Sequence, residues 1–320
     1  MSIVNQTTTN VQEFIILGFP GFQDPDSKAI FFITLLTMYL AILSGNSLLI
    51  IIFAINKELH TPMYILISSL AVTDILISSS TLPKILSVLI SGTSVISVPA
   101  CFIQMFSYHS MKSAESLLLG LMAHDRYLAI SKPLHYFTIV NNSSVLRQIG
   151  CCWMCAFIIV MIPLSLAFRL PFCGPNVVIH YFCDHSTVLK LACSDTTINT
   201  YLGLAIVISI LTLPLIYILF SYTKIIKSVL KIKATRGRQK AFSTCGTHLL
   251  VIAISFFVAA GVYISNRVRD TFSDVRILAA LIQNVVPPLI NPIIYCLRTE
   301  DIRKCFLKVL RRNGRLSERK

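Results

Sequence analysis

The sequence predicts an all-α membrane protein: a seven-transmembrane helix bundle followed by a short amphipathic helix. Of its 320 residues, 55% are hydrophobic and only 13% are charged, which excludes an ordinary soluble globular chain of this length. Seven apolar stretches each reach the length of about 20 residues that a helix needs to cross a bilayer. Because lipid offers the backbone no hydrogen-bond partners and these stretches are too long for barrel strands, each is expected to be a helix.

The expected spans cover residues 29–55, 62–88, 98–124, 146–168, 197–223, 242–264 and 275–297. They divide the chain into a leading segment (1–28), the bundle (29–297) and a tail (298–320). The leading segment is polar and lacks a basic stretch before an apolar core, so the first span is expected to act as its own insertion signal. Proline removes a backbone hydrogen bond, so bends are predicted at the prolines inside the spans: Pro83, Pro163, Pro214, Pro287, Pro288 and Pro292.

The basic residues predict the orientation. Of the 28 lysines and arginines, 20 lie in the tail and around the loops after the first, third and fifth spans. By the positive-inside rule, the protein is expected in the plasma membrane with its N-terminus extracellular and its C-terminus cytosolic. Asn5 then begins a usable glycosylation sequon on the outside. The basic residues that give the net charge of +14 lie in loops and a tail next to the membrane rather than on a soluble domain. No nucleic-acid partner is therefore predicted.

The tail contains an amphipathic pattern in which Ile302, Cys305 and Phe306 recur at helical spacing among basic residues. This pattern is typical of a helix on the membrane surface, held by apolar burial and by anionic lipid. Cys305 is open to two interpretations, a palmitoylated thiol or a plain buried one.

Charged residues within or beside the spans are candidates for function, because such charges are costly in a bilayer. Asp125 and Arg126 directly follow the third apolar run; they are either a functional pair or a mark of the water interface. Asp74 and Glu115 lie deep in apolar spans, where each carboxyl must be paired, neutralised or bound to a metal. Lys112, three residues before Glu115, is one candidate partner.

Four cysteines fall in the segments predicted to be extracellular, where disulfides persist. They are Cys101, Cys173, Cys183 and Cys193, and four cysteines allow three connectivities. The run from His180 to His185 also contains metal-ligand types, but Cys183 cannot ligate as a thiolate once it is oxidised.

Motifs along the spans identify a resemblance. The segments concerned are Gly45-Asn46, His60 to Tyr64, LAVTD ending at Asp74, MAHDRYLAI from Met122, Ser221-Tyr222, KAFSTCGTHL from Lys240, and PPLINPIIYCLR from Pro287. They resemble the rhodopsin-like G-protein-coupled receptors and, within these, the odorant receptors, over nearly the whole chain. The amino-acid sequence of the second span and the residues Phe19-Pro20-Gly21 look most like the class I, fish-type branch.

The resemblance implies an odorant receptor that binds a small, acidic or polar organic molecule from outside. It implies coupling to a stimulatory, olfactory-type heterotrimeric G protein. It also implies bridges Cys101–Cys183 and Cys173–Cys193, and a sodium pocket as the only cofactor site, formed by Asp74, Glu115 and Asn291. The positions that match the coupling switch are Asp125, Arg126, Tyr127, Tyr222 and Tyr295.

The expected ligand residues come from two helices. Tyr108, His109 and Lys112 share one face of the third span by helical spacing, and Tyr263 and Arg267 lie one turn apart near the outer end of the sixth. In the class I branch the position of Arg267 looks like an anchor for an acidic odorant. The competing interpretations pair Arg267 with Asp270, and Lys112 with Glu115.

Three residues depart from the family pattern: His124 stands where an aromatic is usual, Ser131 replaces a cysteine, and Lys112 is an unexpected charge. Rival functions are a receptor for a non-olfactory small molecule, a transporter and a membrane enzyme. Asp74, Glu115 and Lys112 would line a transport path, but no inverted repeat is visible. No spacing of nucleophile and base favours an enzyme, so none is expected.

Overall fold

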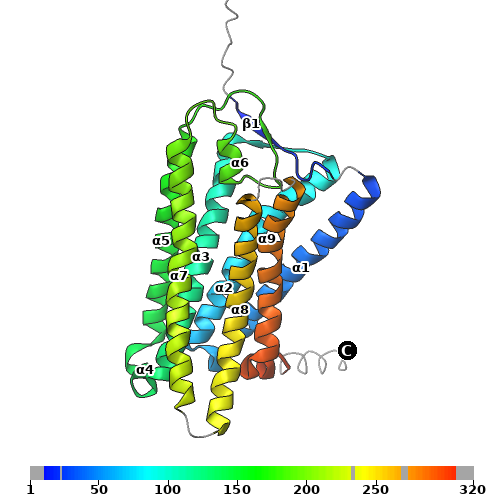
Figure 1. The fold of residues 1–320 in the computed structure, drawn as a ribbon. Coiled ribbons are helices and arrows are strands. Elements are labelled where there is room, and N and C mark those ends of the chain that lie inside the picture. Colours follow the sequence, from blue (N-terminus) through cyan, green and yellow to red (C-terminus); the bar gives the residue numbers. More distant parts are fainter. Residues whose placement is uncertain (1–10, 22–23, 232–234, 268–272, 308–320) are drawn as a thin grey trace, which may run out of the picture.

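The computed structural model describes residues 11–21, 24–231, 235–267 and 273–307, without the side chains of residues 137, 235–244, 263–267 and 298. In these ranges the chain is a bundle of seven long helices (Figure 1), each containing one of the expected spans. They are α1 (Pro25–Ile55), α2 (Pro62–Ser91), α3 (Val98–Ser131), α5 (Asn142–Phe168), α7 (Thr197–Leu230), α8 (Thr235–Arg267) and α9 (Ser273–Arg298). Three short helices join them: η1 (Lys57–Leu59), α4 (Pro133–Ile139) and α6 (His185–Leu189).

Six of the long helices are apolar enough to cross a membrane by length and composition, in the ranges that the structure describes. The remaining long helix is α3, which carries Lys112, Glu115, Asp125 and Arg126. Glu115 and Asp125 are nevertheless buried, and α3 packs against α2, α5 and α7. Its charges therefore face protein at the centre of the bundle, which is how a polar helix can span lipid.

The helices run past the apolar stretches from which they were predicted. For example, α3 continues to Ser131 and α7 to Leu230. Backbone hydrogen bonding continues into polar flanks until a capping residue ends it. At the starts, the side chain of Asp24 accepts from the backbone N–H of Ser27, and Pro25 takes the first helical position, where its missing N–H costs nothing.

A small sheet covers the end of the bundle that carries the N-terminal segment, and the sequence did not predict it. Strand β1 (Glu13–Ile16) pairs antiparallel with β2 (Ser94–Ser97) and parallel with β3 (Val177–Val178). Phe14 and Ile16 of β1 are fully buried. We call this the N-terminal end of the bundle (Figure 1) and the opposite end the C-terminal end.

The motifs of the first and seventh spans contact each other. Asn46 is buried and donates from Nδ2 to the backbone oxygen of Pro288 at 2.9 Å. A Cβ on Gly45 would come within 3.1 Å of Pro292, so the absence of a side chain allows α1 to approach α9 closely.

The helix expected after the seventh span is present over residues 300–307. Cys305 is 6% exposed and packs in a cluster with Ile52 and Leu59, which favours the interpretation as a buried thiol. Tyr64 donates to Asp301 at 2.8 Å, so this helix is also fixed to α2 by a hydrogen bond.

Candidate functional site

A buried hydrogen-bond network joins α3, α9 and the loop after α5 near the N-terminal end. Tyr108 donates to Oδ1 of Asn284 at 3.1 Å, and Nδ2 of Asn284 donates to the hydroxyl of Tyr181 at 2.6 Å. Tyr181 in turn donates to the backbone oxygen of Ala280. Asn284 and Tyr181 are fully buried and Tyr108 is 7% exposed, so the network fixes three segments relative to one another.

Two disulfides hold the loop over this network. Cys101, at the start of α3, is bonded to Cys183, and Cys173 is bonded to Cys193. These are the two bridges that the resemblance implied. The backbone N–H of Cys183 also donates to the side chain of Gln104, which holds the loop close to α3.

His109 reaches a carboxylate of the loop. Its Nε2 lies 3.7 Å from Oδ1 of Asp184, and each side chain is 22% exposed. Burial lowers the pKa of His180 and of His185. Burial raises the pKa of Asp184, but His180, His109 and a hydrogen bond from Ser186 outweigh it and the pKa lies below its usual value. No group of three metal-ligand side chains of the kind His, Cys, Asp or Glu occurs among the described residues.

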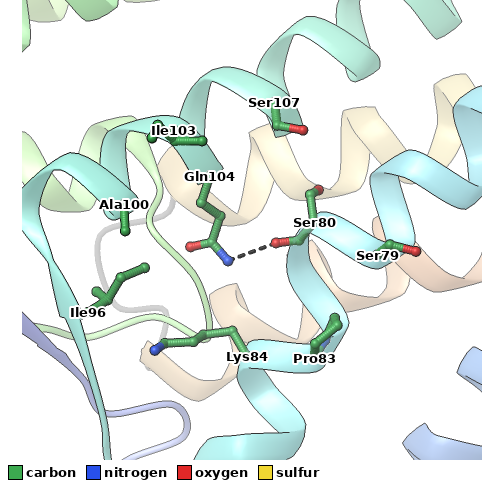
Figure 2. A pocket seen from close by; sticks show the side chains of 9 residues that line it. All are labelled: Ser79, Ser80, Pro83, Lys84, Ile96, Ala100, Ile103, Gln104 and Ser107. Atoms are coloured by element: carbon green, nitrogen blue, oxygen red, sulfur yellow. Dashed lines mark hydrogen bonds between the residues drawn. The ribbon is translucent and has the colours of Figure 1, made fainter.

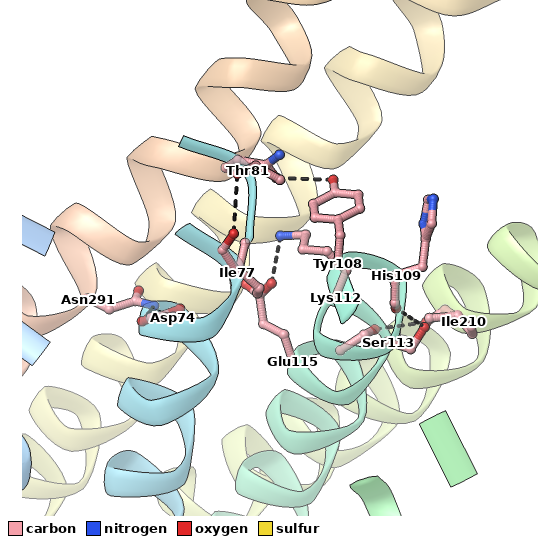
Figure 3. Close-up of polar contacts among 12 residues, drawn as sticks. Asp74, Ile77, Thr81, Tyr108, His109, Lys112, Ser113, Glu115, Ile210 and Asn291 are labelled. Atoms are coloured by element: carbon pink, nitrogen blue, oxygen red, sulfur yellow. Dashed lines mark hydrogen bonds and ion pairs between the residues drawn. The ribbon is translucent and has the colours of Figure 1, made fainter. Parts of the chain in front are cut away.

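Lys112 points to Glu115 rather than to Tyr108 or His109. Its Nζ lies 2.6 Å from Oε2 of Glu115. Asp74 accepts a 2.9 Å hydrogen bond from Asn291 and interacts electrostatically with both Lys112 and Glu115. Figure 3 shows these four side chains between α2, α3 and α9. We call them the carboxylate pocket.

The carboxylate pocket is a poor match for a resident sodium ion. Asp74 Oδ1 and Glu115 Oε1 have no hydrogen-bond partner in the described part of the chain, so oxygens are present. However, a hard cation prefers a shell of oxygen ligands, and here a positively charged amine already occupies the other oxygen of Glu115.

A separate groove of about 450 Å³ opens between α2 and α3 near the N-terminal end. Figure 2 shows Gln104 donating to the backbone oxygen of Ser80 across it, with Lys84 nearby. Lys84 donates to the backbone oxygen of Val95. The expected ligand residues Tyr108, His109 and Lys112 do not line this groove.

At the C-terminal end, Asp125 and Arg126 form an ion pair. Nη2 of Arg126 lies 2.9 Å from Oδ2 of Asp125, and Tyr136 donates to the other carboxylate oxygen at 2.7 Å. Asp125 is 3% exposed. The pair is therefore a satisfied and mostly buried contact rather than two charges exposed to water at the interface.

The remaining residues expected at the switch belong to one hydrophobic cluster or pack against it. Tyr222 and Tyr295 belong to the same buried cluster as Met122, and their hydroxyls have no hydrogen-bond partner in the described ranges. Tyr127 is partly exposed, with its ring 6.5 Å from that of His124.

Two of the departures from the family pattern contact the same helix. His124 hydrogen-bonds through Nδ1 to the hydroxyl of Tyr217, and the hydroxyl of Ser131 lies 2.8 Å from that of Ser228. Tyr217 and Ser228 are both on α7. Each departure thus adds a polar contact between α3 and α7.

Several expected residues lie outside the described part of the structure. Asn5 is in the segment before residue 11, and only the backbone of Tyr263 and Arg267 is described, at the end of α8. Conversely, sequence reasoning missed Asn284, Tyr181 and Tyr136. Asn284 had a usable signal, because a polar side chain inside an apolar span is costly and seven residues before Asn291 places it near the same helix face.

Comparison with known proteins identifies the family. Residues 35–313 match the family model described as "Olfactory receptor". The chain is 35% identical to human olfactory receptor 1M1, over 95% of this chain and 96% of that one. It is 38% identical to human olfactory receptor 1J1 (98% and 96% covered) and 39% identical to mouse olfactory receptor 4B13 (92% and 94% covered).

The family match spans the bundle and takes in both the network around Asn284 and the Asp125–Arg126 pair. The assignment to a particular branch of the family stays a prediction. The chain belongs to the olfactory receptor family, and is a multi-pass G-protein-coupled receptor for odorants rather than an enzyme.

Proposed function

We propose that this receptor lies in the plasma membrane with its N-terminal end outside, where it binds a small acidic or polar odorant. The observation that carries this proposal is the buried polar network of Tyr108, Asn284 and Tyr181. It lies beside His109 and under a loop that two disulfides hold. A few convergent polar groups among apolar side chains are typical of small-molecule sites.

The proposed signalling partner is a stimulatory, olfactory-type heterotrimeric G protein at the C-terminal end. Its support is the family and the Asp125–Arg126 pair, which is closed in this structure. Odorant binding promotes signalling only if the odorant binds the open state more tightly than the closed one. Residues 298–320, in which nine basic residues outnumber three acidic ones, are proposed to lie against anionic lipid on the cytosolic side, and Asn5 is proposed to be glycosylated outside.

Arg267 is proposed as the anchor of an acidic odorant, because Lys112 is already paired with Glu115. A charged hydrogen bond to a guanidinium contributes about 1.5 to 3 kcal/mol. In cells, Arg267→Ala is therefore expected to raise the half-maximal concentration of carboxylic-acid odorants by roughly tenfold to a hundredfold. Responses to alcohols of the same chain length should change little.

Arg269→Ala is the matched control, because it removes the same charge two residues further along the chain. It should leave both classes of odorant nearly unaffected. An equal loss of response to acids and alcohols in Arg267→Ala would contradict the proposal that Arg267 anchors the odorant by its charge. It would not contradict the proposed receptor function.

A further inference from the structure

Lys112 places its positively charged ammonium group in the pocket where the family resemblance implied a bound sodium ion. Its ammonium lies 2.6 Å from Glu115, and the two side chains are 17% and 4% exposed. The pair joins residues three apart on α3, which lie on one face of a helix. The amine is thus delivered by the same helix that carries its partner.

The carboxylate pocket forms one electrostatic unit around this pair. Asp74 is fully buried and interacts with both Glu115 and Lys112. One oxygen each of Asp74 and Glu115 has no hydrogen-bond partner among the described residues. Those two oxygens are what the pocket could offer to a dissolved ion.

The net charge of the pocket decides how strongly such an ion is attracted. The pocket holds two carboxyl groups, and the ammonium of Lys112 cancels the charge of its partner Glu115, so at most one negative charge, that of Asp74, remains. At separations of several ångströms inside a protein, one unit charge changes the interaction with an ion by more than RT. The ammonium therefore reduces the attraction for sodium and also repels it directly.

We infer that Lys112 is the resident cation of the carboxylate pocket and takes the place of a dissolved sodium ion. A tethered ammonium has a second advantage, because it forms the ion pair without loss of translational freedom, whereas a free ion must be captured from solution. The closed bundle of this receptor is consequently stabilised by its own side chain, at any sodium concentration.

The test is the thermal stability of the purified, full-length receptor in nanodiscs. The melting temperature is measured across a titration of sodium chloride, with N-methyl-D-glucamine chloride keeping the ionic strength constant. The melting temperature of wild type is expected to stay constant across the titration. The same is expected of Lys112→Arg, which keeps a cation at this position. Lys112→Met, which keeps the apolar stem without the charge, should be stabilised by sodium, with an affinity at least about tenfold tighter than that of wild type.

Two further variants separate sodium binding from general destabilisation. Lys112→Gln keeps a hydrogen-bond donor for Glu115 and should also gain sodium dependence, so the test holds even if Lys112→Met does not fold. Lys112→Met/Glu115→Gln removes one carboxylate and should lose most of the gain. The inference is overturned if sodium stabilises wild type as strongly as Lys112→Met. It is equally overturned if no Lys112 variant gains sodium dependence. Neither result bears on odorant binding.

Discussion

Single residues carry the connections that the sequence did not predict. Lys112 was expected either to contact ligand or to neutralise Glu115, and its 2.6 Å distance to Glu115 supports the second interpretation. Helical spacing allowed both partners and could not choose between them, because rotamers and neighbours on other helices decide where a long side chain reaches. The same applies to Tyr108, whose partner Asn284 is 176 positions away.

Asn284 is the junction of the buried network, so replacing it removes one hydrogen bond from each of two tyrosine hydroxyl groups. Asn284→Leu removes the acceptor for Tyr108 and the donor to Tyr181. Tyr181 keeps its bond to Ala280, whereas the buried hydroxyl of Tyr108 loses its partner, which costs about 1 to 3 kcal/mol. The variant should therefore unfold at a lower temperature and respond more weakly to odorants.

Gln283→Leu is the control for Asn284→Leu, since it also replaces a side-chain amide by leucine, at the neighbouring, partly exposed position. Thermal unfolding in detergent compares the two variants at equal purity. Equal melting temperatures for both variants would contradict a structural role for the network.

At the scale of elements, the long helices could be predicted because lipid leaves a long apolar run no alternative. The sheet could not. Strand β1 has only four residues, and its partners β2 and β3 begin at residues 94 and 177. Such pairing depends on contacts between distant segments, and a short half-buried strand has little local signature. The helix at residues 300–307 was foreseen, because its amphipathic pattern is local.

The sheet is expected to hold the loop that carries Tyr181. In Ile15→Pro the N–H that bonds to the backbone oxygen of Asn176 is lost, and proline is poorly tolerated within a sheet. Hydrogen–deuterium exchange should become faster at residues 94–97 and 177–180. Ile15→Val, which keeps the N–H and a β-branched side chain, should exchange like wild type. Unchanged exchange in Ile15→Pro would show that pairing with β1 does not hold the loop.

At the scale of the whole molecule, the motifs of the first, second and seventh spans proved to be contacts between helices. Gly45 and Asn46 meet Pro292 and Pro288, and the network around Asn284 lies on the same helix, α9. The carboxylate pocket, also reached by α9 through Asn291, lies between this network and the Asp125–Arg126 pair along α3. Family resemblance located these residues except Asn284 and its partner Tyr181, whereas the direction of each side chain required the folded bundle.

This arrangement makes α3 and α9 the elements through which binding at one end can reach the other. Arg126 is paired with Asp125 in this structure, and in the proposed function activation opens this pair and makes Arg126 available to the G protein. Arg126→Ala should therefore abolish signalling without changing how much receptor reaches the cell surface.

The most direct test of the central claim is cyclic AMP in cells that express the chain, measured beside ion flux for a panel of short acids, amines and alcohols. The account predicts that at least one odorant raises cyclic AMP in a concentration-dependent way, and that Arg126→Ala removes this response at equal surface expression. An odorant-evoked ion flux without cyclic AMP, or a cyclic AMP response that survives Arg126→Ala, would contradict it.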